Sequence, residues 1–219
     1  MNNLKRITQE EFEALYREHL KWLESGGKEG RRLRLTGYDL RELDLKRHDL
    51  RRADLHSTDL SNTDIRWSDL SWANLTRSNL NRSHLAYTDL SGTCLKKVDM
   101  SEGDLHSTDF TGADLRGASM IRVDLRWADL SKARLSMANL EGSYLHTARL
   151  REVDLRGACL KKCIFLEADL RRATLRIADL TDADFTRANL RGADLTKSKC
   201  SGTNFTGANY ELGGPDKWN

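Results

Sequence analysis

An apolar residue recurs at every fifth position along most of the chain. From Leu35 to Tyr210, the positions divisible by five hold Leu, Ile, Met, Phe, Cys or Tyr, and none of them is charged. Two residues before each of these, from Ala53 to Ala208, the residue is always Ala, Ser, Thr, Val, Gly or Cys. A period of five matches neither the 3.6-residue period of an α-helix nor the two-residue period of a strand. The pattern therefore predicts a solenoid whose chain turns a corner every five residues.

The size restriction at these two positions indicates that both side chains point into a narrow core. The large residue fills the core and the small one lets the walls approach, while the other three positions carry mostly polar residues that face water. The second residue after the large one is often glycine, as at Gly92 and Gly112. Glycine suits the positive φ of a type II turn. At corners where Arg, Lys or Trp stands instead, we expect another turn type.

The repeated unit reads Ala-Asp-Leu followed by two variable residues. Clear copies are Ala113-Asp114-Leu115, Ala128-Asp129-Leu130, Ala168-Asp169-Leu170, Ala188-Asn189-Leu190 and Ala193-Asp194-Leu195. In these units the chain resembles the pentapeptide-repeat proteins. The resemblance implies an all-β solenoid, a right-handed quadrilateral β-helix with four units in each coil. The repeats then make about nine coils, and we place the β-helix domain at residues 31–212.

Residues 1–30 stand outside the period and predict an N-terminal capping α-helix and linker. Thr8 and Glu11 form a capping box, and Ile7 can pack on Phe12 as a hydrophobic staple. The apolar face of this helix consists of Phe12, Leu15, Tyr16, Leu20 and Leu23. We interpret the helix as a lid over the open end of the solenoid, whose strand edges would otherwise pair with other chains. The alternative is a separate interaction helix.

The first coil differs from the others at its small inward positions. These hold Leu33, Tyr38, Leu43 and His48 in place of Ala or Thr. Larger groups suit a coil that packs against a helix. We therefore expect His48 to be a packed residue under the lid rather than a ligand.

Residues 213–219 form a C-terminal tail without a helix pattern. Trp218 can fold back over the last coil, or this end of the rod can meet a second copy of the chain. An uncovered strand edge favours pairing, so a homodimer through the C-terminal end is one of two open interpretations.

Phenylalanines are predicted to stack inside the rod. Phe165, Phe185 and Phe205 are twenty residues apart, so four-sided winding places them on one side as a buried ladder. The other core residues that we single out are Phe110, Leu115 and Leu125.

Composition and charge bear on location and partners. The chain of 219 residues has 36 Lys and Arg against 33 Asp and Glu, a net charge of +3, and a mean hydropathy of −0.65. No apolar run is long enough to span a bilayer and no basic-then-apolar leader is present, so we expect a cytoplasmic protein that does not enter membranes. Columns of Asp should stand beside columns of Arg and Lys and compensate them. A DNA mimic, as known among pentapeptide-repeat proteins, needs a negatively charged face, which a net basic chain does not favour.

Cysteine and histidine give no sign of a metal or catalytic site. Cys94 and Cys159 should face outward and Cys163 and Cys200 inward, and no pair has zinc-finger spacing, so we expect free thiols. The histidines, which show no partnership with a nucleophile, are His19, His48, His56, His84, His106 and His146. A filled rod offers no concave site for convergent catalytic groups. We therefore expect no enzyme activity, no cofactor and no bound metal.

Large aromatic residues at outward positions are the one anomaly of the repeats. Trp67, Tyr87 and Trp127 occupy the same place in their units at separations of twenty and forty residues, so they should line one corner of the rod. The residues expected around them are Trp72 round the corner, Tyr144, Ile164 and Leu166 farther along, and Arg66 and Arg126 beside the tryptophans. Exposed Trp with Arg is typical of a protein interface and of a platform for single-stranded nucleic acid. Scattered surface aromatics that cover their neighbours are the third interpretation.

Three functions follow from these observations. The first is a non-catalytic binding rod or scaffold that holds a protein partner. The second comes from the family resemblance and is modulation of a bacterial type II topoisomerase, DNA gyrase or topoisomerase IV, as in the members that protect it from quinolones or toxins. The third is nucleic-acid binding through the basic columns, against which the Asp columns argue.

Overall fold

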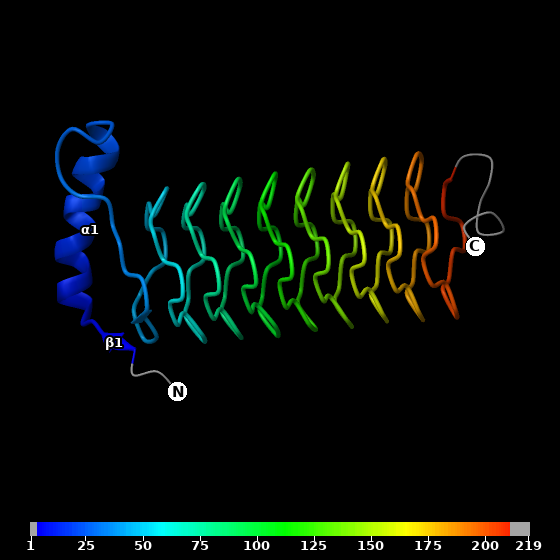
Figure 1. Ribbon diagram of the computed structural model, residues 1–219, viewed down its shortest axis with the longest axis horizontal. Coiled ribbons are helices and arrows are strands. Elements are labelled where there is room, and N and C mark those ends of the chain that lie inside the picture. Colours follow the sequence, from blue (N-terminus) through cyan, green and yellow to red (C-terminus); the bar gives the residue numbers. More distant parts are fainter. Residues whose placement is uncertain (1–3, 211–219) are drawn as a thin grey trace.

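The computed structural model describes residues 4–210, and over this range the protein is a rod with one helix at its N-terminal end (Figure 1). The named elements are β1 (Lys5–Arg6), α1 (Gln9–Glu24) and β2 (Tyr38–Asp39). Strand β1 pairs in parallel with β2, so the segment before the helix is joined to the first coil. The remainder of the rod is held by single bridges rather than by long strands.

Outward residues of each coil pair with the residue twenty positions later. The bridges are all parallel and run from the pair of Arg34 with Asp54 to the pair of Asn189 with Asn209. Because a turn recurs every five residues, a coil of twenty residues has four sides. This is the four-sided β-helix that the family resemblance implies.

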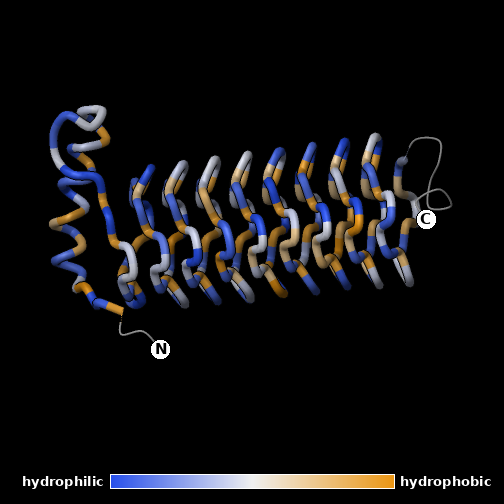
Figure 2. Tube along the Cα trace, in the orientation of Figure 1, coloured by the Kyte–Doolittle hydropathy of each residue, from blue (hydrophilic) through white to orange (hydrophobic). Residues whose placement is uncertain are grey.

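A column of buried side chains fills the rod, and Figure 2 shows hydrophobic and hydrophilic positions recurring in every coil. The central residues expected in the core are fully buried: Phe110, Leu115 and Leu125. The rings of Phe165 and Phe185 stack with centroids 4.5 Å apart, and those of Phe185 and Phe205 with centroids 5.4 Å apart. Phe205 is partly buried. The spacing of twenty residues thus produces the predicted aromatic ladder.

Hydroxyl groups at the small inward positions are hydrogen-bonded to the backbone. Thr88 Oγ1 donates to the Ile65 carbonyl at 2.9 Å, and Ser143 Oγ donates to the Met120 carbonyl at 2.7 Å. A buried hydroxyl without a partner would be destabilising. These bonds explain why the repeat accepts Ser and Thr as well as Ala inside the rod.

The cysteines are all free thiols, as expected. Cys163 is fully buried, and its burial raises the pKa of the thiol to about 12. Cys94, Cys159 and Cys200 are partly buried. Cys163 is therefore an inert core residue.

Every corner of the rod has the same backbone geometry, and here one expectation was wrong. The second residue after each large core residue has a φ between 53° and 72° from Gly37 to Gly207, whether it is glycine or not. Arg122, at 53°, and Trp127, at 61°, are examples where we had expected a different turn. The bridges to both neighbouring coils fix the course of the chain, so a side chain at the corner has to accept the left-handed conformation. That conformation costs about 1–2 kcal/mol for an L-residue.

Helix α1 begins with the predicted capping box. Glu11 N–H donates to Thr8 Oγ1 at 3.2 Å, and the Thr8 N–H donates to the Glu11 carboxylate at 3.0 Å. The helix ends at Glu24, with Ser25 as its C-cap, and is followed by Gly26 and Gly27 with positive φ. Its bounds therefore follow from local sequence signals.

The buried face of α1 differs at two residues from the expected one. Phe12 is buried and Tyr16, Leu20 and Leu23 are partly buried, but Leu15 is 43% exposed. His19 is fully buried instead, and its Nδ1 accepts a hydrogen bond from Leu33 N–H at 3.1 Å. Leu15 lies at the margin of the face that is centred on Phe12 and His19, which is why docking leaves it in contact with water.

The first coil packs against α1 through its large inward residues. His48 lies against the rings of Phe12 and Tyr16, with centroids 5.5 and 4.6 Å away. Asp49 N–H donates to the Tyr16 hydroxyl at 2.9 Å. His48 is therefore a packed residue beneath the helix, as predicted from the sequence.

The proposed tail at residues 213–219, with Trp218 and the C-terminal contact, lies outside the described residues. Within residues 4–210, no helix has the length and apolar character needed to cross a bilayer.

Candidate interaction surface

Trp67, Tyr87 and Trp127 lie along one edge of the rod, which we call the aromatic edge. Each stands at a corner with φ close to 60°, and the side chains are 46%, 53% and 59% exposed. Because successive coils are in register, residues twenty apart are neighbours along the rod axis. The sequence therefore predicted the alignment of these three side chains correctly.

The N-terminal part of the aromatic edge is a stack. The rings of Trp67 and Tyr87 are parallel to within 1°, with centroids 6.0 Å apart. The guanidinium groups of Arg66 and Arg47 lie 5.1 and 5.5 Å from the Trp67 ring. Tyr87 in turn meets the edge of the His106 ring at 5.0 Å. These contacts hold the exposed rings in defined orientations.

Arg47 and His106 were not among the residues selected from the sequence. Arg47 precedes Trp67 by twenty residues, so the period that aligned the aromatic residues also places Arg47 beside them. His106 follows Tyr87 by nineteen residues and reaches it from the adjoining wall. The axial spacing was thus the signal that could have found Arg47.

The two arginines predicted beside the tryptophans are each held by a carboxylate. Arg66 donates to Asp64 through Nε at 2.9 Å and through Nη2 at 2.7 Å. Arg126 likewise donates to Asp124 through Nε at 2.9 Å and through Nη2 at 2.6 Å. Its guanidinium group lies 5.4 Å from the ring of Trp127. Side-chain hydrogen bonds from Arg66 lower the pKa of Asp64. Both arginines are therefore oriented before any partner arrives.

This pairing of an Asp with the Arg two positions later recurs along the rod. The bidentate pairs are Asp39 with Arg41, Asp49 with Arg51, Asp64 with Arg66, Asp114 with Arg116, Asp124 with Arg126, Asp154 with Arg156, and Asp169 with Arg171. Each pair neutralises an outward carboxylate within its own coil. The acidic columns are therefore largely compensated by basic side chains, as the sequence led us to expect.

A groove of about 760 Å³ opens beside the C-terminal part of the aromatic edge. Trp127, Tyr144 and Leu166 supply its apolar lining, and His146 and Arg126 are among its polar residues. The rings of Tyr144 and His146 stack with centroids 6.2 Å apart. The groove thus joins Trp127 to Tyr144 and Leu166, which the sequence placed on the same side.

Trp72 belongs to a different corner from the aromatic edge. It is 66% exposed, and its ring lies so close to Gly92 that a Cβ there would be 2.8 Å from it. Trp72 borders a hollow of about 340 Å³ together with Trp22 and Leu23 of α1. The structure therefore separates Trp72 from the other candidate residues.

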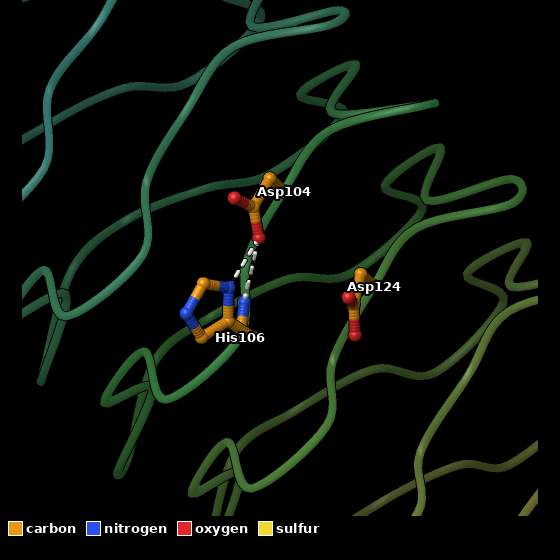
Figure 3. A group of neighbouring side chains, drawn as sticks. All are labelled: Asp104, His106 and Asp124. Atoms are coloured by element: carbon orange, nitrogen blue, oxygen red, sulfur yellow. Dashed lines mark hydrogen bonds and ion pairs between the residues drawn. The ribbon is translucent and has the colours of Figure 1, made fainter.

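Asp104, His106 and Asp124 form a cluster that the sequence analysis did not identify (Figure 3). One donor atom from each residue lies within 4.8 Å of those of the other two. His106 Nδ1 is 2.6 Å from Asp104 Oδ1. The cluster was missed because Asp124 is brought to the other two only by the twenty-residue winding.

The comparisons with known proteins agree with this architecture. A family model described as pentapeptide repeats matches the chain in eight copies, over residues 34–71, 65–101, 108–146, 148–187 and 178–209. No curated protein matches the chain.

Similar solved structures include QnrB1, a plasmid-mediated fluoroquinolone resistance protein. Its trypsin-treated R167E form has a TM-score of 0.67 and 18% identity, with 83% of this chain and 86% of that chain covered. The full-length form has a TM-score of 0.55 and 19% identity, with 85% and 95% covered.

A further match is HetL, a pentapeptide repeat protein involved in heterocyst differentiation regulation in the cyanobacterium Nostoc sp. strain PCC 7120. It has 29% identity and a TM-score of 0.42, with 87% of this chain and 92% of that chain covered. From its repeats and its coils, the chain belongs to the pentapeptide-repeat family.

Proposed function

We propose that the protein is a non-catalytic scaffold that binds a partner protein through the aromatic edge and the adjoining groove. The rod of about nine coils, covered at its N-terminal end by α1, supplies a rigid support. The observation that carries the proposal is the exposed stack of Trp67 and Tyr87 with Arg47 and Arg66 around it. Trp, Tyr and Arg are the residues that dominate binding energy at protein interfaces.

The fold itself gives no reason for tryptophan at these corners. Other corners of the rod carry Gly with the same positive φ, as at Gly92 and Gly112. A tryptophan in that conformation costs about 1–2 kcal/mol and leaves a large apolar surface in water. Because every corner shares the positive φ, the backbone does not favour tryptophan at these two; burial of the exposed surface of Trp67 and Trp127 by a partner would account for their presence.

The arrangement of charge favours a protein over a nucleic acid as the partner. Arg66 and Arg126 are both paired with aspartates, and the aspartate column continues beside them. Phosphate groups would meet those carboxylates as well as the arginines. A protein surface with mixed charge and an apolar centre fits the edge better.

Capture of partners from cells that produce the protein tests the proposal. The test variant is Trp67→Gly with Trp127→Gly, because glycine is native to these corners. The control is Met137→Gly with Ile177→Gly, which removes apolar side chains that are 73% and 65% exposed at corners of another edge.

We expect wild type and the control to capture the same partner and the tryptophan variant to lose it. Equal capture by the tryptophan variant would refute the proposal. Partner binding that weakens steeply with salt and is abolished by nuclease would instead indicate a nucleic acid.

Modulation of DNA gyrase or topoisomerase IV is the second candidate. QnrB1, a fluoroquinolone resistance protein, shares the fold at 18% identity, and that similarity motivates the test. The compensated aspartates, such as Asp114 paired with Arg116, speak against an acidic DNA mimic. A supercoiling assay with and without the protein and a fluoroquinolone decides the matter, since no change in activity or drug sensitivity would exclude this function.

A further inference from the structure

The geometry of Asp104, His106 and Asp124 points to a binding site for one divalent transition-metal ion, with zinc as the probe. Two carboxylates and one imidazole converge on the same wall of the rod, from two successive coils (Figure 3). The inference does not depend on the proposed partner, because the three ligands all belong to this chain.

The distances require only small movements of side chains. Donor atoms that are each about 2.1 Å from one ion can be at most about 4.2 Å apart, and the atoms of this cluster already lie within 4.8 Å of one another. The short contact between His106 Nδ1 and Asp104 Oδ1 is a hydrogen bond, so the metal would replace the proton between them. The backbone positions of both coils are fixed by bridges and need not move.

The chemistry of the donors selects the class of ion. Imidazole with carboxylates suits zinc and its first-row neighbours, whereas calcium and magnesium prefer oxygen ligands alone. Arg126 donates hydrogen bonds to the Asp124 carboxylate through Nε and Nη2 and so fixes its orientation, as a residue behind a ligand commonly does.

The chain contains a second copy of the same local sequence that lacks the third ligand. Residues 53–59 read ADLHSTD and residues 103–109 read GDLHSTD. In the first copy His56 Nδ1 is 3.0 Å from Asp54 Oδ1, much as His106 meets Asp104.

The residue twenty positions after the first aspartate distinguishes the two copies. It is Asn74 in the first copy, and its Nδ2 donates to Asp54 Oδ1 at 3.1 Å. An amide N–H occupies the place that Asp124 fills with a carboxylate in the second copy. One residue therefore separates a metal site from a hydrogen-bonded pair, and the chain supplies its own control.

The cluster borders the groove beside the aromatic edge. Asp104 and Asp124 line that groove together with Trp127 and Tyr144. Three protein ligands leave at least one coordination position of a zinc ion to water or another donor. That position would be reached from the groove.

Zinc titration of the full chain tests the inference. The parent for all variants carries Cys94→Ser, Cys159→Ser and Cys200→Ser, so that the partly buried thiols cannot bind zinc. Isothermal titration calorimetry gives the stoichiometry, and histidine ring NMR signals show which imidazole is the ligand. Thermal unfolding of each metal-free variant checks that it is folded.

We expect the parent to bind one zinc ion per chain and to shift the signals of His106 first. Asp124→Asn should weaken binding by about tenfold or more, and asparagine is native to this column elsewhere, as at Asn204. Asn74→Asp should add a second zinc ion and shift the signals of His56. No binding by the parent, or equal binding by Asp124→Asn, would overturn the inference, as would an Asn74→Asp variant that stays at one ion.

Discussion

Removal of the central ring of the phenylalanine ladder is the perturbation whose effect can be worked out most fully. Phe185 is fully buried and stacks on Phe165 at 4.5 Å and on Phe205 at 5.4 Å. Phe185→Ala leaves a void between two rings. The bridges between coils hold the coil spacing, so the walls cannot close around the void.

The expected loss follows from these contacts. Truncation of a buried Phe costs about 3–5 kcal/mol, and each lost aromatic pair accounts for about 0.5–1.5 kcal/mol of stability. We therefore expect Phe185→Ala to lower the free energy of unfolding by about 4–5 kcal/mol. Phe205→Ala should lower it by roughly half as much, because Phe205 is only partly buried.

Phe185→Leu is the matched control. Leu125 and Leu145 occupy the same side of the core in earlier coils and are fully buried, so leucine fits the site and should cost about 1–2 kcal/mol. Urea unfolding followed by circular dichroism gives all three values. A loss below about 2 kcal/mol for Phe185→Ala, or an equal loss for Phe205→Ala, would refute the packing argument.

Three other predictions concern corners and titratable groups. Lys132 is a corner residue with φ 60°. Lys132→Gly should raise the melting temperature, since relief of the backbone strain of about 1–2 kcal/mol exceeds the entropy cost of about 0.5–1 kcal/mol for glycine. Ser131→Gly at the preceding position is the control and should lower the melting temperature. Hydrogen bonds from Arg171 lower the pKa of Asp169 to about 2, so the stability contributed by this carboxylate is present above pH 4 and lost as the pH falls towards 2. The stability deficit of Asp169→Asn, about 1 kcal/mol at pH 7, should therefore shrink over that interval in urea unfolding, and a constant deficit would contradict it. Burial lowers the pKa of His19, so the stability that the neutral imidazole contributes is present above its ordinary pKa near 6.5 and is lost as the pH falls below that value. His19→Gln should therefore make the free energy of unfolding depend less on pH between pH 7 and 5. An unchanged slope would show that His19 does not cause this pH dependence.

The parts of the fold that the sequence predicts are those determined within one unit or one turn of helix. The core at every fifth residue, the capping box of Thr8 and Glu11, and the ladder of Phe165 and Phe185 all follow from spacing and side-chain size. A slip of one residue would bury charge, so the repeat specifies its own register.

The corners show where local preference fails. Glycine at Gly112 suggests positive φ, but Trp127 and Arg122 adopt the same conformation because the neighbouring coils impose it. The exposed Leu15 and the buried His19 are a similar case. The helical period gives an apolar face, while the exact direction in which it docks depends on the coil beneath.

The candidate surface was predicted where a single column of positions defines it and missed where two coils meet. Trp67 and Tyr87 share a column and were found together. The cluster of Asp104, His106 and Asp124 combines two columns and two coils, and its third member is distant in sequence. Such clusters become visible only when the repeat is arranged in coils of twenty.

Photochemical crosslinking along the aromatic edge tests its role in partner binding most directly. Ser107 lies between Tyr87 and Trp127 at a corner of the same edge, with φ 57°, and Lys197 lies at a corner of the edge that carries Ile177. A photoreactive amino acid placed at either site forms a covalent crosslink, on illumination of the cells, to any protein in contact with that edge. The account predicts a discrete crosslinked partner from position 107 and none from position 197. Identical products from both positions, or none from position 107, would contradict it.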